Sequence, residues 1–106
     1  MLNAGPAKKV TIYVSQDQKY HRDSVYGAIL EFLFRSKVSG AMVTRGIAGF
    51  GAEHHLQTDR ILALTENLPM KVEFIETADK VAELLPKLQE MAGTGGIAMS
   101  EVEVIK

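Results

Sequence analysis

The 106-residue sequence predicts an α+β fold of six elements in the order strand, helix, strand, strand, helix, strand. Two observations support this prediction: short segments in which apolar and polar residues alternate, and two longer segments with apolar residues at helical spacing. The order is that of a ferredoxin-like sandwich, in which a four-stranded antiparallel sheet carries both helices on one face. One domain over residues 8–106 is therefore expected, after a flexible N-terminus at residues 1–7.

The first strand is expected at residues 10–14, where valine and isoleucine alternate with threonine and tyrosine. A helix should follow over residues 22–38. Asp23 or Ser24 suits its first turn, and Gly40 comes just after its end.

The second strand is expected at residues 41–48 and the third at residues 71–74, joined by a loop that is long for a domain of this size. The second helix is expected over residues 78–91, with Thr77 as its N-cap. Pro86 lies on the face opposite the apolar stripe of this helix, so it is expected to bend the helix without breaking it.

The last strand contains a change of parity. Ile97 and Met99 belong to one alternation, whereas Val102 and Val104 belong to the other. An extra residue near Glu101 would return all four side chains to one face, so the pattern predicts a β-bulge there.

The apolar surface of this fold exceeds what one sheet face can cover. On the first helix Tyr26 and Phe34 widen the apolar arc, so that either a loop or another subunit must cover them. The second face of the sheet is expected to carry Thr11, Tyr13 and Val43, which make it only half polar. Both observations favour an oligomer.

The most informative segment is the glycine-rich run at the end of the second strand and the polar loop after it. Glycine permits a positive φ and close approach of a ligand or another backbone, and long loops in small domains are usually reserved for binding. The loop residues expected to meet a partner are Glu53, His54, His55, Gln57, Asp59 and Arg60.

Composition excludes several classes of function. With 12 basic and 13 acidic residues, the chain shows no charge excess of the kind that binds nucleic acid or anionic membranes. It has no cysteine, which excludes disulfides and thiolate zinc sites and fits a reducing compartment. No apolar run approaches the roughly 18 residues of a membrane span, and the N-terminus lacks the layout of a signal peptide. A cytoplasmic protein is expected.

Four segments of the chain, in unbroken order, resemble the PII-like family of uncharacterised proteins (domain of unknown function 190): residues 20–26, 41–51, 68–73 and 82–88. The chain is more distantly similar to the PII nitrogen-regulatory signalling proteins. The resemblance implies a PII-like homotrimer with a mobile loop, the T-loop, after the second strand. It also implies that a small effector, in PII proteins usually an adenine nucleotide, binds in clefts between subunits, and that the loop docks on a transporter, channel, enzyme or regulator.

The same resemblance implies which residues bind the effector. They are the run at the base of the T-loop and the glycine-rich turn before the last strand: Arg45, Gly46, Gly49, Phe50, Gly51, Gly93, Thr94, Gly95 and Gly96. Successive glycines let backbone N–H groups converge on an anion. Basic residues that pair with phosphates in PII proteins are replaced here, for example by Ala52 and Gly96. AMP, ADP or a different metabolite is therefore expected in place of a triphosphate.

Each of these features also has a purely structural explanation. The glycines of residues 46–51 can form a bulge or a tight turn, and residues 93–96 can be a plain connection from helix to strand. Arg45 can pair across the sheet with Glu73 or Glu103 in place of a ligand.

The sequence offers little support for metal binding or catalysis. His54 and His55 are adjacent, so on an extended segment they point in opposite directions and do not easily share a metal ion. Nothing in the spacing suggests a Ser-His-acid arrangement, and no enzyme is expected. Two functions remain: a regulatory protein that senses a small effector, or an effector-independent interaction module on a membrane transporter or channel.

Overall fold

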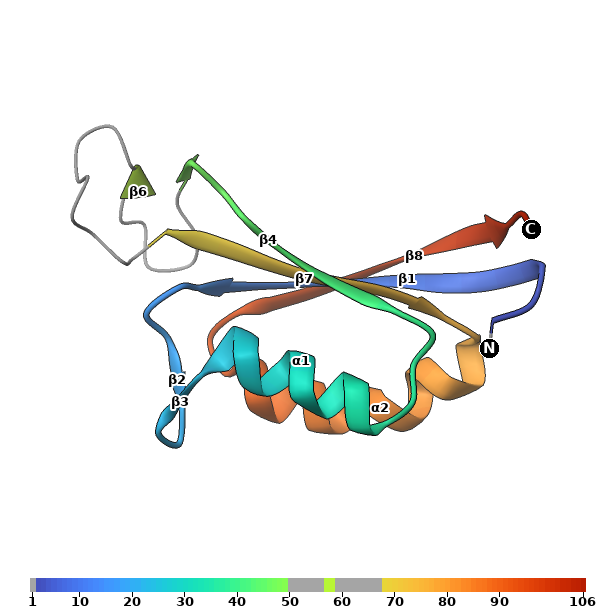
Figure 1. Ribbon diagram of the computed structural model, residues 1–106, viewed down its shortest axis with the longest axis horizontal. Helices are drawn as coiled ribbons and strands as arrows, with labels where there is room; N and C mark the ends of the chain where they lie inside the picture. The colour runs from blue at the N-terminus through green and yellow to red at the C-terminus, as the bar shows by residue number, and fades with distance from the viewer. Residues whose placement is uncertain (1, 50–56, 59–67) are drawn as a thin grey trace.

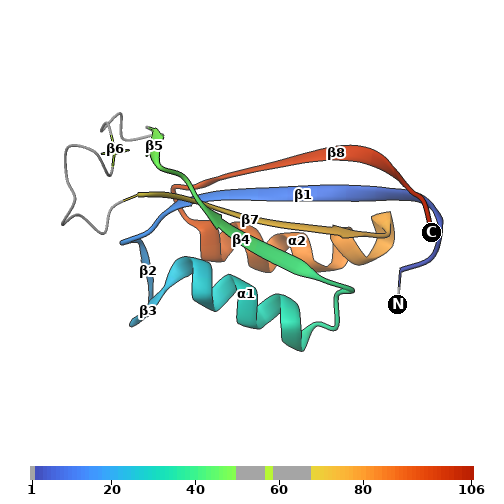
Figure 2. The same ribbon diagram turned by 45° about the horizontal axis from the view of Figure 1, so that its top comes forward.

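The computed structural model describes residues 2–49, 57–58 and 68–106, and it confirms the predicted α+β fold. Its main sheet has four antiparallel strands in the order β4-β7-β1-β8. These strands are β1 (Gly5–Ser15), β4 (Ala41–Arg45), β7 (Pro69–Glu76) and β8 (Gly96–Val104). The helices α1 (Val25–Arg35) and α2 (Ala78–Ala92) lie side by side on one face of this sheet (Figures 1 and 2).

Two short hairpins accompany the sheet. In one, β2 (Lys19–Tyr20) pairs with β3 (Asp23–Ser24) just before α1. In the other, β5 (Ala48–Gly49) pairs with β6 (Gln57–Thr58) after β4.

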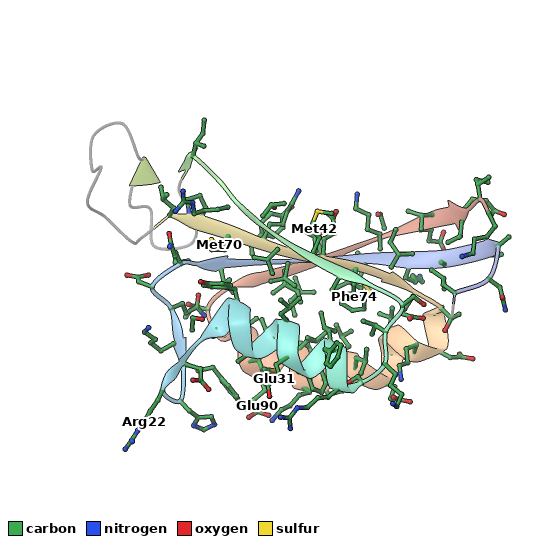
Figure 3. All side chains as sticks on the ribbon, viewed as in Figure 1. Arg22, Glu31, Met42, Met70, Phe74 and Glu90 are labelled. Carbon is green, nitrogen blue, oxygen red and sulfur yellow. The ribbon has the colours of Figure 1, made fainter. Side chains whose placement is uncertain are left out.

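The core lies between the sheet and the two helices. The even-numbered residues of β1 and β7 face the helices, as the alternation predicted, and Val10, Ile12 and Val72 are fully buried. In Figure 3, Phe74 likewise lies between the sheet and the helix layer. The buried cluster consists of Val10, Ile12, Val14, Val25, Ile29, Leu33, Met70, Val72, Phe74, Val81, Leu84, Leu88, Met91 and Ala92.

The first helix is shorter than predicted. It begins at Val25, because Asp23 and Ser24 belong to a hairpin strand, and it ends at Arg35. The residue with left-handed backbone after the helix is Lys37, with a φ of 64°, and not Gly40. The Val38 N–H then bonds back to the Leu33 carbonyl at 3.3 Å, which closes the helix end.

The second helix agrees with its prediction at both tested points. The Thr77 hydroxyl accepts a hydrogen bond from the Lys80 N–H at 3.3 Å, as an N-cap does. Pro86 is exposed, and the helix runs through it from Ala78 to Ala92 without a break.

The bulge predicted in the last strand is wrong. The β1–β8 register advances one residue at a time from Tyr13↔Gly96 to Gly5↔Val104, with no extra residue on either strand. The apolar alternation changes because the two ends of the strand place their apolar side chains on opposite faces of the sheet. Ile97 packs against the core, whereas Val102 lies on the other face of the sheet, opposite Ala7 of β1.

The same pairing places the start of β1 at Gly5, inside the segment assigned to the N-terminus at residues 1–7. Ala7 is buried there. Within the described part of the chain, no helix is long and apolar enough to cross a membrane.

Candidate functional site

The two segments predicted to bind an effector lie at the same end of the sheet. Arg45, the last residue of β4, pairs with Met70, which in turn pairs with Val14 near the end of β1. Tyr13, the residue of β1 next to Val14, pairs with Gly96, the first residue of β8. Figure 1 shows this end of the sheet at the left, away from both chain termini.

Within one chain, however, these segments occupy opposite edges of the sheet. β4 and β8 are separated by β7 and β1, which corresponds to about 14 Å at the usual spacing of strands. Within a single chain, Arg45 and the glycine-rich turn therefore do not lie next to each other.

Arg45 is exposed, and it has no ion pair with any residue that the structure describes. The alternative of a cross-sheet pair with Glu73 or Glu103 is wrong. Glu73 instead accepts a hydrogen bond from the Thr11 hydroxyl at 3.0 Å, and Glu103 lies on the opposite edge strand. The Arg45 guanidinium thus remains available to a ligand or a partner.

Gly46 has a structural role that the sequence did not reveal. Its N–H donates to the Pro69 carbonyl at 2.7 Å and so extends the pairing of β4 with β7 by one residue. A Cβ on Gly46 would lie 2.8 Å from Cγ of Pro69, which is too close for an ordinary contact. The backbone donor of Gly46 is therefore already used within the fold.

In the glycine-rich turn, as at Gly46, glycine amides are used for hydrogen bonds within the fold. The Gly93 N–H donates to Gln89 at 3.3 Å, and the Gly95 N–H donates to Ala92 at 2.8 Å, so both amides complete the C-terminus of α2. Thr94 is exposed, and its N–H bonds to no acceptor in the described residues. The free polar groups of the turn are thus centred on Thr94.

Other predicted residues lie outside the described ranges: Phe50, Gly51, Glu53, His54, His55, Asp59 and Arg60. Two positions flanking them are described at the backbone level, because Gly49 pairs with Gln57 in the β5–β6 hairpin. In the described residues, no group of three histidine, cysteine or acidic side chains could hold a metal ion.

The face of the sheet away from the helices differs from its prediction in one residue. Val43 pairs with Val72 and packs against the core, so it does not belong to this face. Its neighbour Met42 lies there instead and is 64% exposed (Figure 3). Tyr13, which was correctly predicted on this face, is 53% exposed.

Polar side chains lie between these two apolar ones. The Glu73 carboxylate, which binds Thr11, also lies 3.7 Å from the Lys9 ammonium and 3.9 Å from that of Lys71. All four residues come from the two central strands, so the middle of this face is a compact ion-paired cluster with apolar neighbours.

A second cluster, which the sequence did not predict, joins the β2–β3 hairpin to the end of α2. The Tyr20 hydroxyl donates to Glu90 at 2.9 Å and accepts from Lys87 at 3.0 Å, and the Tyr20 ring packs edge-on against His21 at 4.4 Å. The hydrogen bond from Tyr20, followed by the charge of Lys87, lowers the pKa of Glu90. The hydrogen bond to Tyr20 and the charge of Glu90 raise the pKa of Lys87.

We expect Tyr20→Phe to raise the pKa of Glu90 towards its ordinary value, because the largest cause of the depression is removed. A carboxylate with a lowered pKa stabilises the fold above its unfolded-state pKa, and this stabilisation is lost as the pH falls through the folded-state pKa. The difference in stability between Tyr20→Phe and the wild type should therefore shrink in acid, below about pH 4.

The measurement is an NMR titration of the Glu90 carboxyl carbon in both proteins. Tyr26→Phe is the matched control, since this tyrosine packs against the core from α1. An unchanged Glu90 titration in Tyr20→Phe would contradict the assignment.

The family model DUF190, described as "Uncharacterized ACR, COG1993", matches residues 7–104. A UPF0166 protein of Methanocaldococcus jannaschii is 33% identical over 91 residues, which are 86% of this chain and 83% of that protein.

Solved structures show the same fold. CPII, a nitrogen regulatory PII-like protein of Thiomonas intermedia bound to ADP, AMP and bicarbonate, superposes with a TM-score of 0.69 at 19% identity, covering 98% of this chain and 92% of CPII. A putative PII-like signaling protein of Thermus thermophilus superposes with a TM-score of 0.67 at 17% identity, covering 98% of this chain and 94% of that one.

Proposed function

Because the chain belongs to the DUF190 family and has the fold of PII-like proteins, we propose that it is a PII-like regulatory protein. It acts as a homotrimer that binds an adenine nucleotide between subunits. It passes this signal through the loop of residues 52–67 to a protein partner, a transporter, channel or enzyme. It acts by binding and not by catalysis. The nucleotide-bound CPII structure supports the choice of ligand class.

The position of the two candidate segments is the observation that best supports this function. They lie at one end of the sheet but on opposite edges, and in the described chain β4 and β8 each pair on one side only. Strand direction alternates across the sheet, so the two edge strands β4 and β8 run in opposite directions. In a closed ring whose copies meet edge to edge, the β4 of one subunit would therefore lie antiparallel to the β8 of the next. Such a ring brings Arg45 of one copy to the glycine-rich turn of its neighbour.

The open face of the sheet supports self-association independently. Tyr13 and Met42 expose apolar surface on this face. The charged side chains between them are ion-paired with one another, because Glu73 binds Lys9 and Lys71. Exposed apolar side chains on an open sheet face often mark a contact between subunits.

The available groups also indicate the size of the ligand. Arg45 supplies a cation with no ion pair to a described residue. Thr94 supplies a hydroxyl and an N–H that bonds to no described acceptor, and together these groups suit one or two phosphate groups. We therefore expect ADP or AMP to bind more tightly than ATP.

The test is calorimetric titration of the wild type with AMP, ADP, ATP, cyclic AMP and bicarbonate. Binding of ADP or AMP is expected, and Arg45→Gln should weaken it about tenfold because a charge-assisted contact to phosphate is lost. Arg35→Gln is the matched control, since Arg35 is exposed on α1 and pairs with Glu31 at 2.7 Å. Absence of heat with every compound would contradict the sensing function and favour an effector-independent module.

A further inference from the structure

Gln18 lies between β1 and the β2–β3 hairpin, and its side chain contacts both the nearby end of β1 and the distant end of α2. Its Nε2 donates to the Ala92 carbonyl at 2.7 Å, and its Oε1 accepts from the Ser15 N–H at 3.4 Å. The backbone of Gln18 is held as well, because its N–H bonds to Ser15 at 3.1 Å and its carbonyl accepts from Val25 at 2.8 Å. Both ends of this residue are therefore fixed.

The Ala92 carbonyl is the group that organises the glycine-rich turn. It belongs to the last residue of α2 and accepts a second hydrogen bond, from the Gly95 N–H at 2.8 Å. A Cβ on Gly93 would lie 3.7 Å from Nε2 of Gln18, so the Gln18 amide group lies directly against the turn. Moving this carbonyl would change the direction of the Gly95 amide and, with it, the backbone of Thr94.

We infer that Gln18 is a positioning residue for the glycine-rich turn. By holding the Ala92 carbonyl, it keeps the turn in the conformation that pairs the amides of Gly93 and Gly95 internally and leaves the Thr94 N–H free for an anion. The anion-binding part of this inference rests on the function proposed above, whereas the positioning part can be measured without any ligand.

Tyr20 provides a matched control. It joins the same hairpin to the same end of α2, and its hydroxyl bonds to the side chains of Glu90 and Lys87. Among the described residues, its hydroxyl has no hydrogen bond to the backbone of the turn, and phenylalanine keeps the ring that packs against the core, so Tyr20→Phe should leave the turn unchanged.

The experiment compares Gln18→Met with Tyr20→Phe and the wild type. Methionine has a similar length to glutamine but neither donates to Ala92 nor adds a charge near the site. Hydrogen exchange of the Gly95 amide, followed by NMR, should be about fivefold faster in Gln18→Met. Exchange at Val81, in the first turn of α2, should not change. The affinities for ADP and for inorganic phosphate, measured well below the melting temperature, should each fall about fivefold.

The possible results separate the claims. Unchanged Gly95 exchange in Gln18→Met would overturn the positioning role, and so would equal exchange in Tyr20→Phe and Gln18→Met. Faster exchange with unchanged ADP and phosphate affinity would overturn the link to anion binding. If the wild type binds neither ADP nor phosphate, the proposed function fails, and the exchange measurement alone still decides whether Gln18 positions the turn.

Discussion

Replacing Gly95 with alanine is expected to destabilise the protein by about 3 kcal/mol, a large fraction of the stability of a domain of this size. A Cβ at this position would overlap the Tyr13 carbonyl oxygen and would lie 3.1 Å from the Ala92 carbonyl oxygen. Both are backbone atoms, one on the central strand β1 and one at the end of α2. They can move only if the sheet and the helix move apart.

Gly96→Ala is the control for this prediction. A Cβ on Gly96, one residue further along, would meet nothing within 4 Å, so this variant should remain within about 0.5 kcal/mol of the wild type. Urea unfolding of the three proteins gives the comparison. Equal stability of Gly95→Ala and Gly96→Ala would show that the turn is loosely packed against β1.

The second large effect concerns assembly. Tyr13→Glu should convert the proposed homotrimer into a monomer of 11.6 kDa, because the contact between copies would then bury a carboxylate without enough partners. The isolated subunit should still fold. Tyr13 is 53% exposed in the single chain, so a carboxylate at this position stays in contact with water.

Phe34→Glu tests the other surface that could hold a neighbouring subunit. Phe34 is 82% exposed on α1, so in the single chain no loop of the described residues covers it. Sedimentation velocity of both variants distinguishes the two faces. A trimer that survives Tyr13→Glu but is lost in Phe34→Glu would place the interface on α1 and would contradict the role of the open sheet face.

Local patterns were sufficient to predict most of the fold. The alternation at Val10 and Ile12 identified β1 and its buried face, and Thr77 identified the start of α2. These predictions succeeded because side-chain direction in a strand and capping at a helix end depend on residues only a few positions apart.

Two predictions that failed in the sheet concern the face on which a side chain lies. The parity change in β8 resembles a bulge in the sequence, but it reflects a strand that packs against the core at Ile97 and places Val102 on the opposite face. Val43 was predicted on the wrong face of the sheet for a related reason. A five-residue strand of mostly apolar or small residues has no alternation that identifies its buried side, so its pairing with Val72 decides it.

The candidate site was likewise predictable in part from the sequence and in part only from the structure. Residue order alone identifies the segments that carry glycine, arginine and threonine, and hence the parts of the chain that can approach an anion. The folded arrangement was needed to show that these segments share one end of the sheet, that they lie on opposite edges, and that Gln18 holds Ala92 from 74 positions away. Contacts over such separations form because the whole sheet and both helices pack at once, and no local pattern of residues encodes them.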